Sequence, residues 1–326
     1  IIGTNWITAQ FVEANKIAAS ATLTAVYSRT AAKAEQFVES VQGQDVAIFT
    51  DLAEFFASPA FDTVYIASPN SLHFTQAKLA LEHDKNVIVE KPAFATRAQF
   101  TEIAETLAAH PQAFFFEAAR HLYDPNFRVA SAQIEKMTAL NGATISYMKY
   151  SSRYDNVLNG EEPNIFSPKF AGGALQDLGV YTVYAAVKWF GLPTQATYFP
   201  DMIRTGVDGK GTAILEYPEF KVTLLFGKTA NSYIPTEVYD QKETLWIDNI
   251  GTMDQVKLYD AKGQATDLTV AHPKNPMVDE ARAFAKMINE QDYAQMRELF
   301  SLAEQVNQTV YALRQSAKIK FAQDED

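Results

Sequence analysis

The sequence predicts two domains: an α/β domain built on a parallel, doubly wound sheet, and an α+β domain with a large, open, mostly antiparallel sheet. Its 326 residues exceed the length at which one hydrophobic core usually keeps growing. Residues 1–120 alternate short apolar runs with amphipathic stretches of helical period, which is typical of a parallel sheet covered on both faces. Residues 121–326 instead alternate strand-like segments with a few helices. The last helix is also a candidate to pack back on the first domain.

Five short apolar runs are the predicted strands of the first domain. They span 23–28, 46–49, 63–67, 86–91 and 113–118. Between them lie apolar stripes of helical period, such as Phe74, Ala77 and Leu81. Connections in such a sheet are right-handed, and ligands bind beyond the carboxyl ends of the strands. We therefore expect functional residues directly after each run.

The second domain begins where this alternation stops. Helical patterns are predicted over 127–140, 173–190, 277–288 and 293–317, and strands over 143–154, 196–200, 211–217, 220–226, 244–247 and 256–259. The dipeptide Pro218-Glu219 between two strands indicates a hairpin. Gly191-Leu192-Pro193 stops the second of the helices.

Charge and composition exclude several classes of function. The net charge of -11 and the pI near 5.0 oppose generic attraction to nucleic acid or to an anionic membrane. Because the chain has no cysteine, disulfides, thiolate metal sites and cysteine nucleophiles are ruled out. The five histidines lack ligand spacing, so we expect no metal site.

The same features fit a cytoplasmic protein whose partner is a small molecule. No apolar run approaches the roughly 18 residues of a membrane span. The opening Ile1-Ile2-Gly3 reads as the end of a strand, which predicts that a few residues precede it.

The first turn lies where a dinucleotide-binding Rossmann fold has its three-glycine fingerprint. Gly3 holds the first glycine position, whereas Asn5 and Thr8 stand at the second and third. Asn tolerates left-handed geometry, and N–H groups at a helix start can still receive a pyrophosphate. A plain strand-to-helix turn is an equally good interpretation of this segment alone. The cofactor-binding residues predicted here are Gly3, Thr4, Asn5, Trp6 and Ile7.

The end of the second strand bears on the choice of cofactor. A carboxylate here would bind a ribose 2′-hydroxyl and repel a 2′-phosphate, but the sequence reads Ser28-Arg29-Thr30. Arg29 can pair with phosphate, which favours NADP, with NAD as the second candidate. The alternative is that Arg29 is a solvated loop charge.

Three further motifs carry a family resemblance. They are Ser68-Pro69-Asn70 with His73, Glu90-Lys91-Pro92, and the run Gly172-Gly173-Ala174-Leu175-Gln176-Asp177-Leu178-Gly179-Val180-Tyr181. Together with Gly3 they resemble the Gfo/Idh/MocA oxidoreductases. Tyr181 stands where many members have histidine, and with Glu117 this is similar to the branch of dihydrodiol dehydrogenases and glucose-fructose oxidoreductase.

The resemblance implies a fold, a cofactor class and a reaction type. Residues 1–120 would form the NAD(P)-binding Rossmann domain, and 121–326 a domain for substrate binding and for assembly into a homodimer or homotetramer. The reaction would transfer hydride between the nicotinamide and a CH–OH or C=O group of a sugar, polyol or similar cyclic alcohol. The further cofactor-binding residues implied are Ser68, Pro69, Asn70, His73, Glu90 and Lys91.

Lys91, Asp177 and Tyr181 are the predicted catalytic residues. Lys91 follows a buried strand, where desolvation can bring its pKa towards neutrality. Asp177 and Tyr181 are four residues apart, so on a helix they project from one face. Whether Lys91 or Tyr181 is the ultimate acid or base stays open.

Substrate choice is predicted to depend on polar and aromatic residues that precede the Asp177 helix. The candidates are Arg120, Arg153, Asn164 and Phe166. Two alternatives remain: a non-catalytic dinucleotide-binding sensor of the same fold, and a dihydrodiol dehydrogenase.

Overall fold

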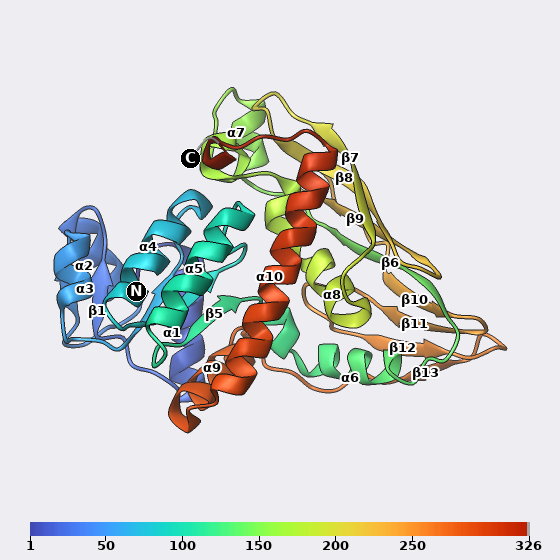
Figure 1. The fold of residues 1–326 in the computed structure, drawn as a ribbon, viewed down its shortest axis with the longest axis horizontal. Coiled ribbons are helices and arrows are strands. Elements are labelled where there is room, and N and C mark those ends of the chain that lie inside the picture. The colour runs from blue at the N-terminus through green and yellow to red at the C-terminus, as the bar shows by residue number, and fades with distance from the viewer. Residues whose placement is uncertain (325–326) are drawn as a thin grey trace. The chain divides into compact units, whose positions relative to one another are not determined.

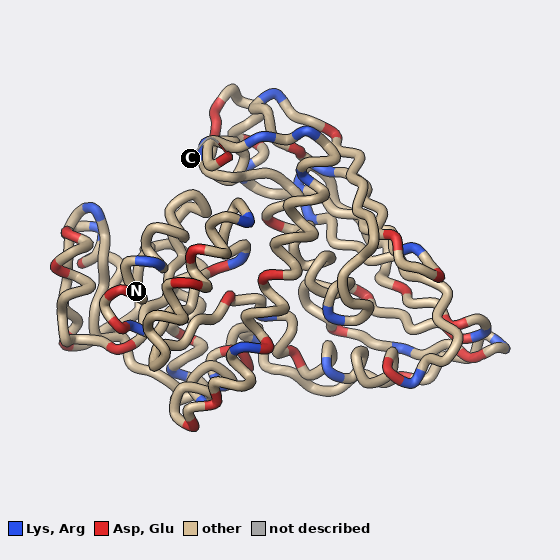
Figure 2. Tube along the Cα trace, viewed as in Figure 1, with Lys and Arg blue, Asp and Glu red and all other residues tan. Residues whose placement is uncertain are grey.

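The computed structural model describes residues 1–324 and divides into two compact units (Figure 1). The N-terminal unit comprises Ile1–Arg120 and Pro273–Ser301, and the C-terminal unit comprises His121–His272 and the residues from Leu302 onward. The chain passes from the N-terminal to the C-terminal unit after Arg120, and residues 273–301 belong to the N-terminal unit again. Lys and Arg positions are interspersed with Asp and Glu positions over both units (Figure 2).

The N-terminal unit is the predicted parallel α/β domain. Its strands are β1 (Ala25–Tyr27), β2 (Ala47–Phe49), β3 (Thr63–Ile66), β4 (Asn86–Glu90) and β5 (Phe115–Ala118). Its helices are α1 (Trp6–Ala18), α2 (Ala31–Ser40), α3 (Leu52–Ala57), α4 (Asn70–Glu82), α5 (Arg97–Ala109) and α9 (Val278–Glu290). All strand pairs in this unit are parallel, which confirms the fold class.

Ile2 joins the two parts of this sheet. β1 pairs with β2, and β3-β4-β5 form a separate ladder, while Ile2 makes a parallel bridge to Tyr27 on one side and to Ile66 on the other. The Ile2 N–H donates to the Tyr65 carbonyl at 2.8 Å, and the Ala67 N–H donates to the Ile2 carbonyl at 2.9 Å. The residues after every strand therefore emerge at one edge of the sheet.

Gly3 is required where the chain leaves this central position. Its φ is +100°, and a Cβ built on it would lie 2.6 Å from the Ala67 carbonyl oxygen. Any other residue would meet both an unfavourable backbone conformation and a backbone atom of the next strand.

The C-terminal unit is built on one eight-stranded sheet. In chain order the strands are β6 (Leu140–Met148), β7 (Gln195–Met202), β8 (Asp208–Glu216), β9 (Lys221–Gly227), β10 (Thr236–Asp240), β11 (Glu243–Ile247), β12 (Val256–Tyr259) and β13 (Ala265–Asp267). Their order across the sheet is β13-β12-β11-β10-β6-β9-β8-β7. β6 and β9 are parallel and the other pairs are antiparallel, so the sheet is mixed but mostly antiparallel, as predicted.

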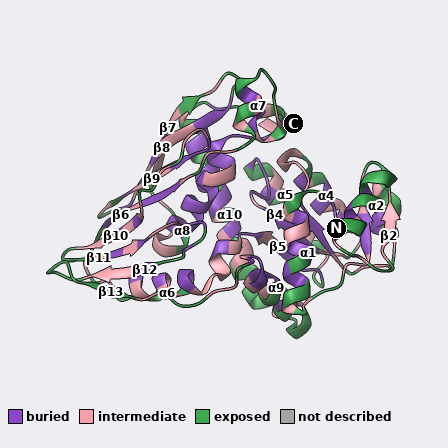
Figure 3. Ribbon diagram, turned by 180° about the vertical axis from the view of Figure 1, so that it is seen from behind, coloured by how far each residue is buried: buried purple, intermediate pink, exposed green. Residues whose placement is uncertain are grey.

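Helices complete this unit. They are α6 (Pro125–Ile134), α7 (Tyr154–Leu158), α8 (Val180–Phe190), which follows a π-helical turn (Leu175–Gly179), and α10 (Tyr293–Ser316), which begins in the N-terminal unit. α8 contacts β6 and β9, and its residues 180–187 are all buried (Figure 3). Because α8 is apolar and packs on the sheet, the π-helical turn that precedes it is also held against the sheet.

Several predicted boundaries are wrong. The helix predicted over 127–140 ends at Ile134, and the following strand already begins at Leu140. Gly142 explains the difference, because a Cβ there would lie 2.7 Å from the Lys221 carbonyl oxygen, an approach that strand pairing requires and a helix does not. The same strand ends at Met148, short of the predicted residue 154, and the strands β10 and β13 were not predicted.

Replacing Gly3 by alanine tests the close approach at the centre of the sheet. Gly160 is the matched control, since its φ of +94° is similar but a Cβ there would have no atom within 4 Å. We expect Gly160→Ala to lower the free energy of unfolding by roughly 1–2 kcal/mol from backbone strain alone. Gly3→Ala should cost about 2 kcal/mol more because of the added clash. Equal losses in urea denaturation would contradict the close approach.

Candidate functional site

The predicted cofactor residues of the N-terminal unit lie at strand ends or in the turns and helix starts that follow them, at one edge of its sheet. The first turn follows Ile2, Ser28 follows β1, Ser68 follows β3, and Lys91 follows β4. This is the edge at which parallel α/β sheets bind ligands. The structure therefore gathers segments that are up to 90 residues apart in the sequence.

Asn5 organises the turn before α1. Its Oδ1 accepts hydrogen bonds from the N–H groups of Ile7 and Thr8, at 3.0 and 3.2 Å, and its Nδ2 donates to the Ala67 carbonyl at 2.9 Å. The Asn5 side chain thus caps the N-terminus of α1, at a position where the fingerprint has glycine. The N–H groups of Thr4, Asn5 and Trp6 make no hydrogen bond to any residue within 1–324.

Those three N–H groups fit a pyrophosphate. Unpaired donors at a helix N-terminus form an anion site, which the helix dipole strengthens. Ile7 is excluded as a backbone donor here, because Asn5 already accepts its N–H. The side chain of Trp6 is 73% exposed, so it remains accessible to a planar ligand group.

The residues that would choose between NADP and NAD lie at the next strand end. Arg29 and Thr30 are exposed and Ser28 is half-buried. Ser68 lies two strands away, and its Oγ donates to Oε1 of Gln76 in α4 at 2.7 Å. Asn70 is the first residue of that helix, directly after Pro69.

His73 connects two of these loops. It is 1% exposed, with Nδ1 at 3.0 Å from the Pro92 carbonyl oxygen and Nε2 at 2.9 Å from the Ser68 carbonyl oxygen. Burial lowers the pKa of His73, although the carbonyl contacts oppose this effect. His73 thus links the segment after β3 to the Lys91-Pro92 segment.

A buried group of acids lies beside Lys91. Oε1 of Glu90 accepts a 2.5 Å hydrogen bond from the Tyr65 hydroxyl. Glu280 of α9 is fully buried, and neither of its carboxyl oxygens has a hydrogen-bond partner among residues 1–324. Burial raises the pKa of Glu90, and burial together with the charge of Glu90 raises the pKa of Glu280 well above its usual value. The positive charges of Lys91 and Arg120 oppose the pKa shift of Glu90, and that of Arg120 also opposes the pKa shift of Glu280.

Glu117 also supports the Lys91 segment. Its Oε1 accepts a hydrogen bond from the Ala93 N–H at 3.1 Å, so the last strand of the sheet holds the loop after β4. Lys91 itself is half-buried, between the buried residues Glu90 and Pro92. The residues that follow Lys91 are therefore held by Glu117 of β5 and by His73 of α4.

In the C-terminal unit the Asp177 turn is built on two glycines and a buried acid. Gly173 has a φ of +117°, and Asp208 approaches it so closely that no Cβ would fit. Oδ2 of Asp208 accepts hydrogen bonds from the Leu175 N–H and from the Tyr198 hydroxyl, both at 2.7 Å. Burial raises the pKa of Asp208 despite these bonds.

Asp177 forms an ion pair that the sequence did not suggest. Its Oδ2 lies 2.7 Å from Nζ of Lys228, a residue that is 1% exposed and follows β9. The Lys228 ammonium also lies 4.5 Å from the centre of the Phe166 ring. Phe166 is fully buried, so in this structure it covers Lys228, which argues against the predicted direct contact with substrate. The feature of the sequence that could have indicated Lys228 is its place directly after a predicted strand.

Tyr181 lies among aromatic rings. Its ring is 5.2 Å from that of Tyr147 on β6, edge to face, and 4.7 Å from that of His121. Such contacts fix the orientation of the Tyr181 ring. The reactive group of this side chain is its hydroxyl. Arg153 and Asn164 are exposed, just before α7 and at the start of a 3-10 helix (Asn164–Phe166).

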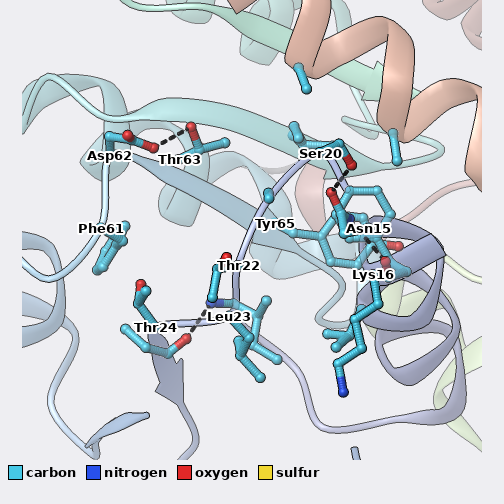
Figure 4. Close-up of a pocket in the computed structure, with 18 of the residues that line it drawn as sticks. Asn15, Lys16, Ser20, Thr22, Leu23, Thr24, Phe61, Asp62, Thr63 and Tyr65 are labelled. Atoms are coloured by element: carbon cyan, nitrogen blue, oxygen red, sulfur yellow. Dashed lines mark hydrogen bonds between the residues drawn. The ribbon is translucent and has the colours of Figure 1, made fainter. Parts of the chain in front are cut away.

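A pocket of about 800 Å³ lies at the opposite edge of the N-terminal sheet (Figure 4). Thr22, Leu23 and Thr24 line it before β1, and Asp62 and Thr63 line it at the start of β3, with α1 and α9 as further walls. The candidate cofactor and catalytic residues are not among its lining residues. The pocket is thus separate from the strand-end site.

A search of residues 1–324 finds no group of three metal-binding side chains and no helix suited to crossing a membrane.

Comparison with known proteins gives a consistent picture. A family model described as an oxidoreductase family with an NAD-binding Rossmann fold matches residues 1–117. The scyllo-inositol 2-dehydrogenase (NADP(+)) of Bacillus subtilis is 39% identical over 290 residues, which cover 89% of this chain and 88% of that protein. A trans-1,2-dihydrobenzene-1,2-diol dehydrogenase of Xenopus tropicalis is 26% identical over 166 residues, covering 50% of this chain and 48% of that protein.

Solved structures share the fold over nearly the whole chain. A 3-ketoreductase from Actinomadura kijaniata, in complex with NADP and TDP-benzene, has a TM-score of 0.82 at 20% identity. The match covers 97% of this chain and 96% of that one. At this identity the likeness supports the fold alone.

The buried acids predict a pH-dependent stability. In the folded protein Glu280 keeps its proton at a pH where the unfolded chain has lost it, so raising the pH above about 4.5 favours unfolding. We expect Glu280→Gln to gain stability over the wild type as the pH rises from 5 to 8, by up to ~1.4 kcal/mol per pH unit. Urea denaturation at each pH measures the difference. Glu290→Gln, at the exposed end of α9, is the control, and an unchanged difference across this range would contradict the assignment.

Proposed function

Because this chain belongs to the Gfo/Idh/MocA family of oxidoreductases, we propose that it is an NADP-dependent dehydrogenase that oxidises a ring hydroxyl of a cyclic polyol and reduces the corresponding ketone. The observation that carries the proposal is the 39% identity, over most of both chains, to a protein named as scyllo-inositol 2-dehydrogenase (NADP(+)). A cyclic polyol is therefore the first substrate to test.

The residues at the strand ends fit NADP. The N–H groups of Thr4, Asn5 and Trp6 would bind the pyrophosphate, and Ser28 with Arg29 would bind the 2′-phosphate. Because Arg29 and Thr30 are exposed, an incoming phosphate needs no rearrangement of buried side chains. No carboxylate follows β1 to repel that phosphate.

Proton transfer is the task of the chain's own residues, since the nicotinamide, when bound, supplies the hydride chemistry. We assign the proton of the substrate hydroxyl to Nζ of Lys91 or to the Tyr181 hydroxyl, each of which can hold or release it. Asp177 would accept a hydrogen bond from a substrate hydroxyl and so orient it. Lys91 belongs to the N-terminal unit, and Asp177 and Tyr181 belong to the C-terminal unit.

Substrate choice is assigned to three polar side chains, of which Arg120 is half-buried and the other two are exposed. Arg120, Arg153 and Asn164 carry donors suited to several hydroxyls of one ring. Phe166 is reassigned from substrate contact to shielding Lys228, because it is fully buried.

A dihydrodiol dehydrogenase is the second candidate, favoured by the similarity of half the chain to such an enzyme. A panel of inositols, sugars and trans-dihydrodiols, assayed by nicotinamide absorbance with NADP and with NAD, separates the two. Oxidation of an inositol in preference to a dihydrodiol supports the proposal. Binding of NADP without turnover of any compound would instead indicate a sensor of the same fold.

We also propose a homodimer or homotetramer in the cytoplasm. The edge strand β7 exposes large apolar side chains, with Phe199 62% and Met202 49% exposed, and such groups are often covered by another chain. Sedimentation equilibrium measures the assembly, and a monomer at micromolar concentration would contradict it.

Replacing Lys91 tests the proton-transfer assignment. We expect Lys91→Ala to lower kcat by at least ~100-fold, because a positioned acid or base contributes about that much, while calorimetry still detects NADP binding. Lys286→Ala, which removes an exposed lysine of α9, should leave kcat unchanged. Full activity of Lys91→Ala on a verified substrate would remove Lys91 from the mechanism.

Replacing Arg29 tests cofactor choice. Arg29→Ala should weaken NADP binding by roughly 10-fold to 100-fold, as expected for the loss of a charge-assisted hydrogen bond to phosphate, and should leave NAD binding nearly unchanged. Lys33→Ala, another exposed cation close by in the sequence, controls for the general effect of charge. Equal losses for both cofactors would count against a contact between Arg29 and the 2′-phosphate.

A further inference from the structure

Lys228 is an unusual residue for its position. Lysines are almost never fully buried unless they are paired, and Lys228 is 1% exposed. Its backbone is fixed on both sides, since its N–H donates to the Gly209 carbonyl at 2.8 Å and its carbonyl accepts from the Ser151 N–H at 2.9 Å. The ammonium therefore has a defined place at the end of β9.

One carboxylate and one aromatic ring contact this ammonium, and a second carboxylate feels its charge. Oδ2 of Asp177 lies 2.7 Å from Nζ, and the Phe166 ring centre lies 4.5 Å from it. The positive charge of Lys228 also acts on Asp208, where it lowers a pKa that burial raises. A buried cation is stabilised by such neighbours, and a buried carboxylate without a cation is strongly destabilised.

The other titratable groups near the Asp177 turn are phenols and His121, whose ring lies 4.7 Å from that of Tyr181. Tyr198 of β7 donates to Asp208, while Tyr181 of α8 and Tyr147 of β6 pack against each other. Burial and the charge of Asp208 raise the pKa of Tyr198, so this phenol stays neutral. Lys228 is thus the cation of this group in the C-terminal unit that pairs with Asp177.

We infer that Lys228 is a positioning residue that holds Asp177 as an oriented carboxylate, so that Asp177 accepts a hydrogen bond from the substrate and does not itself carry the transferred proton. The inference about the substrate rests on the proposed function, whereas the inference about the Asp177 charge does not. It narrows the choice of proton carrier to Lys91 and Tyr181.

The charge of Asp177 can be measured without any substrate. In protein labelled with ¹³C at the aspartate carboxyls, the signal lost in Asp177→Asn identifies Asp177, and its shift against pH gives the pKa. We expect Lys228→Met to raise this pKa by at least about one unit, since an opposite charge at this distance is lost. Lys210→Met removes an exposed lysine paired with Asp201 on the same sheet and should leave the value unchanged. An equal pKa in wild type and Lys228→Met would overturn the inference.

Kinetics on a verified substrate separate positioning from general structural damage. Lys228→Met should lower kcat more than it raises KM and should move the acidic limb of the kcat profile to higher pH. Because the two residues act as one unit, the double variant Asp177→Asn/Lys228→Met should be within about twofold of Asp177→Asn alone. The inference would be overturned if the loss of kcat in the double variant equalled the product of the two single losses and the pH profile of Lys228→Met were unshifted.

Folding of the variants provides an independent comparison. Lys228→Met leaves the half-buried Asp177 carboxylate without its cation, so it should melt at a lower temperature than the double variant, in which neither charge remains. A double variant that is no more stable than Lys228→Met would overturn the pairing. If the wild type turns over no compound of the panel, the proposed function fails, whereas a raised Asp177 pKa in Lys228→Met still supports the pairing.

Discussion

The two-sided pairing of Ile2 is the constraint on which the N-terminal unit depends. One residue bridges β1 and β3 and so makes a single sheet from two ladders. Gly3 follows it because only glycine fits against the Ala67 carbonyl with a φ of +100°. With the sheet in this register, the segments after its strands share one edge, which brings together the residues proposed to bind NADP.

Each unit has buried or half-buried charged groups among its candidate functional residues. In the N-terminal unit, Glu90 and Glu280 are buried acids near the positive charges of Lys91 and Arg120, and their pKa values are raised. In the C-terminal unit, Asp177 is paired with Lys228. Glu90 and Glu280 thus lose their protons less readily than usual, whereas Lys228 keeps Asp177 charged. Environment, rather than residue type, assigns different roles to carboxyl groups of the same intrinsic acidity.

Sequence patterns predicted the parallel sheet because its buried strands are short, continuous apolar runs between helical stretches. They missed β10 and β13, whose mixed polar residues give no clear alternation. The role of Asn5 as a helix cap was also missed, because the glycine fingerprint has no capping side chain at this position. Lys228 could not be assigned from the sequence, since its partner Asp177 is 51 residues away and only the fold brings them together. The roles of Lys91, Tyr181 and Arg29 remain predictions.

Transfer of deuterium to a cyclic ketone from NADPH that carries deuterium at both hydrogen positions of the nicotinamide C4 tests the central claim most directly. In single-turnover reactions analysed by mass spectrometry, the account predicts that the label is found on the carbon that bears the new hydroxyl, because hydride passes directly between cofactor and substrate. Reduced product without the label, or bound NADPH that reduces none of the inosose, sugar and diol-derived ketones, would contradict it.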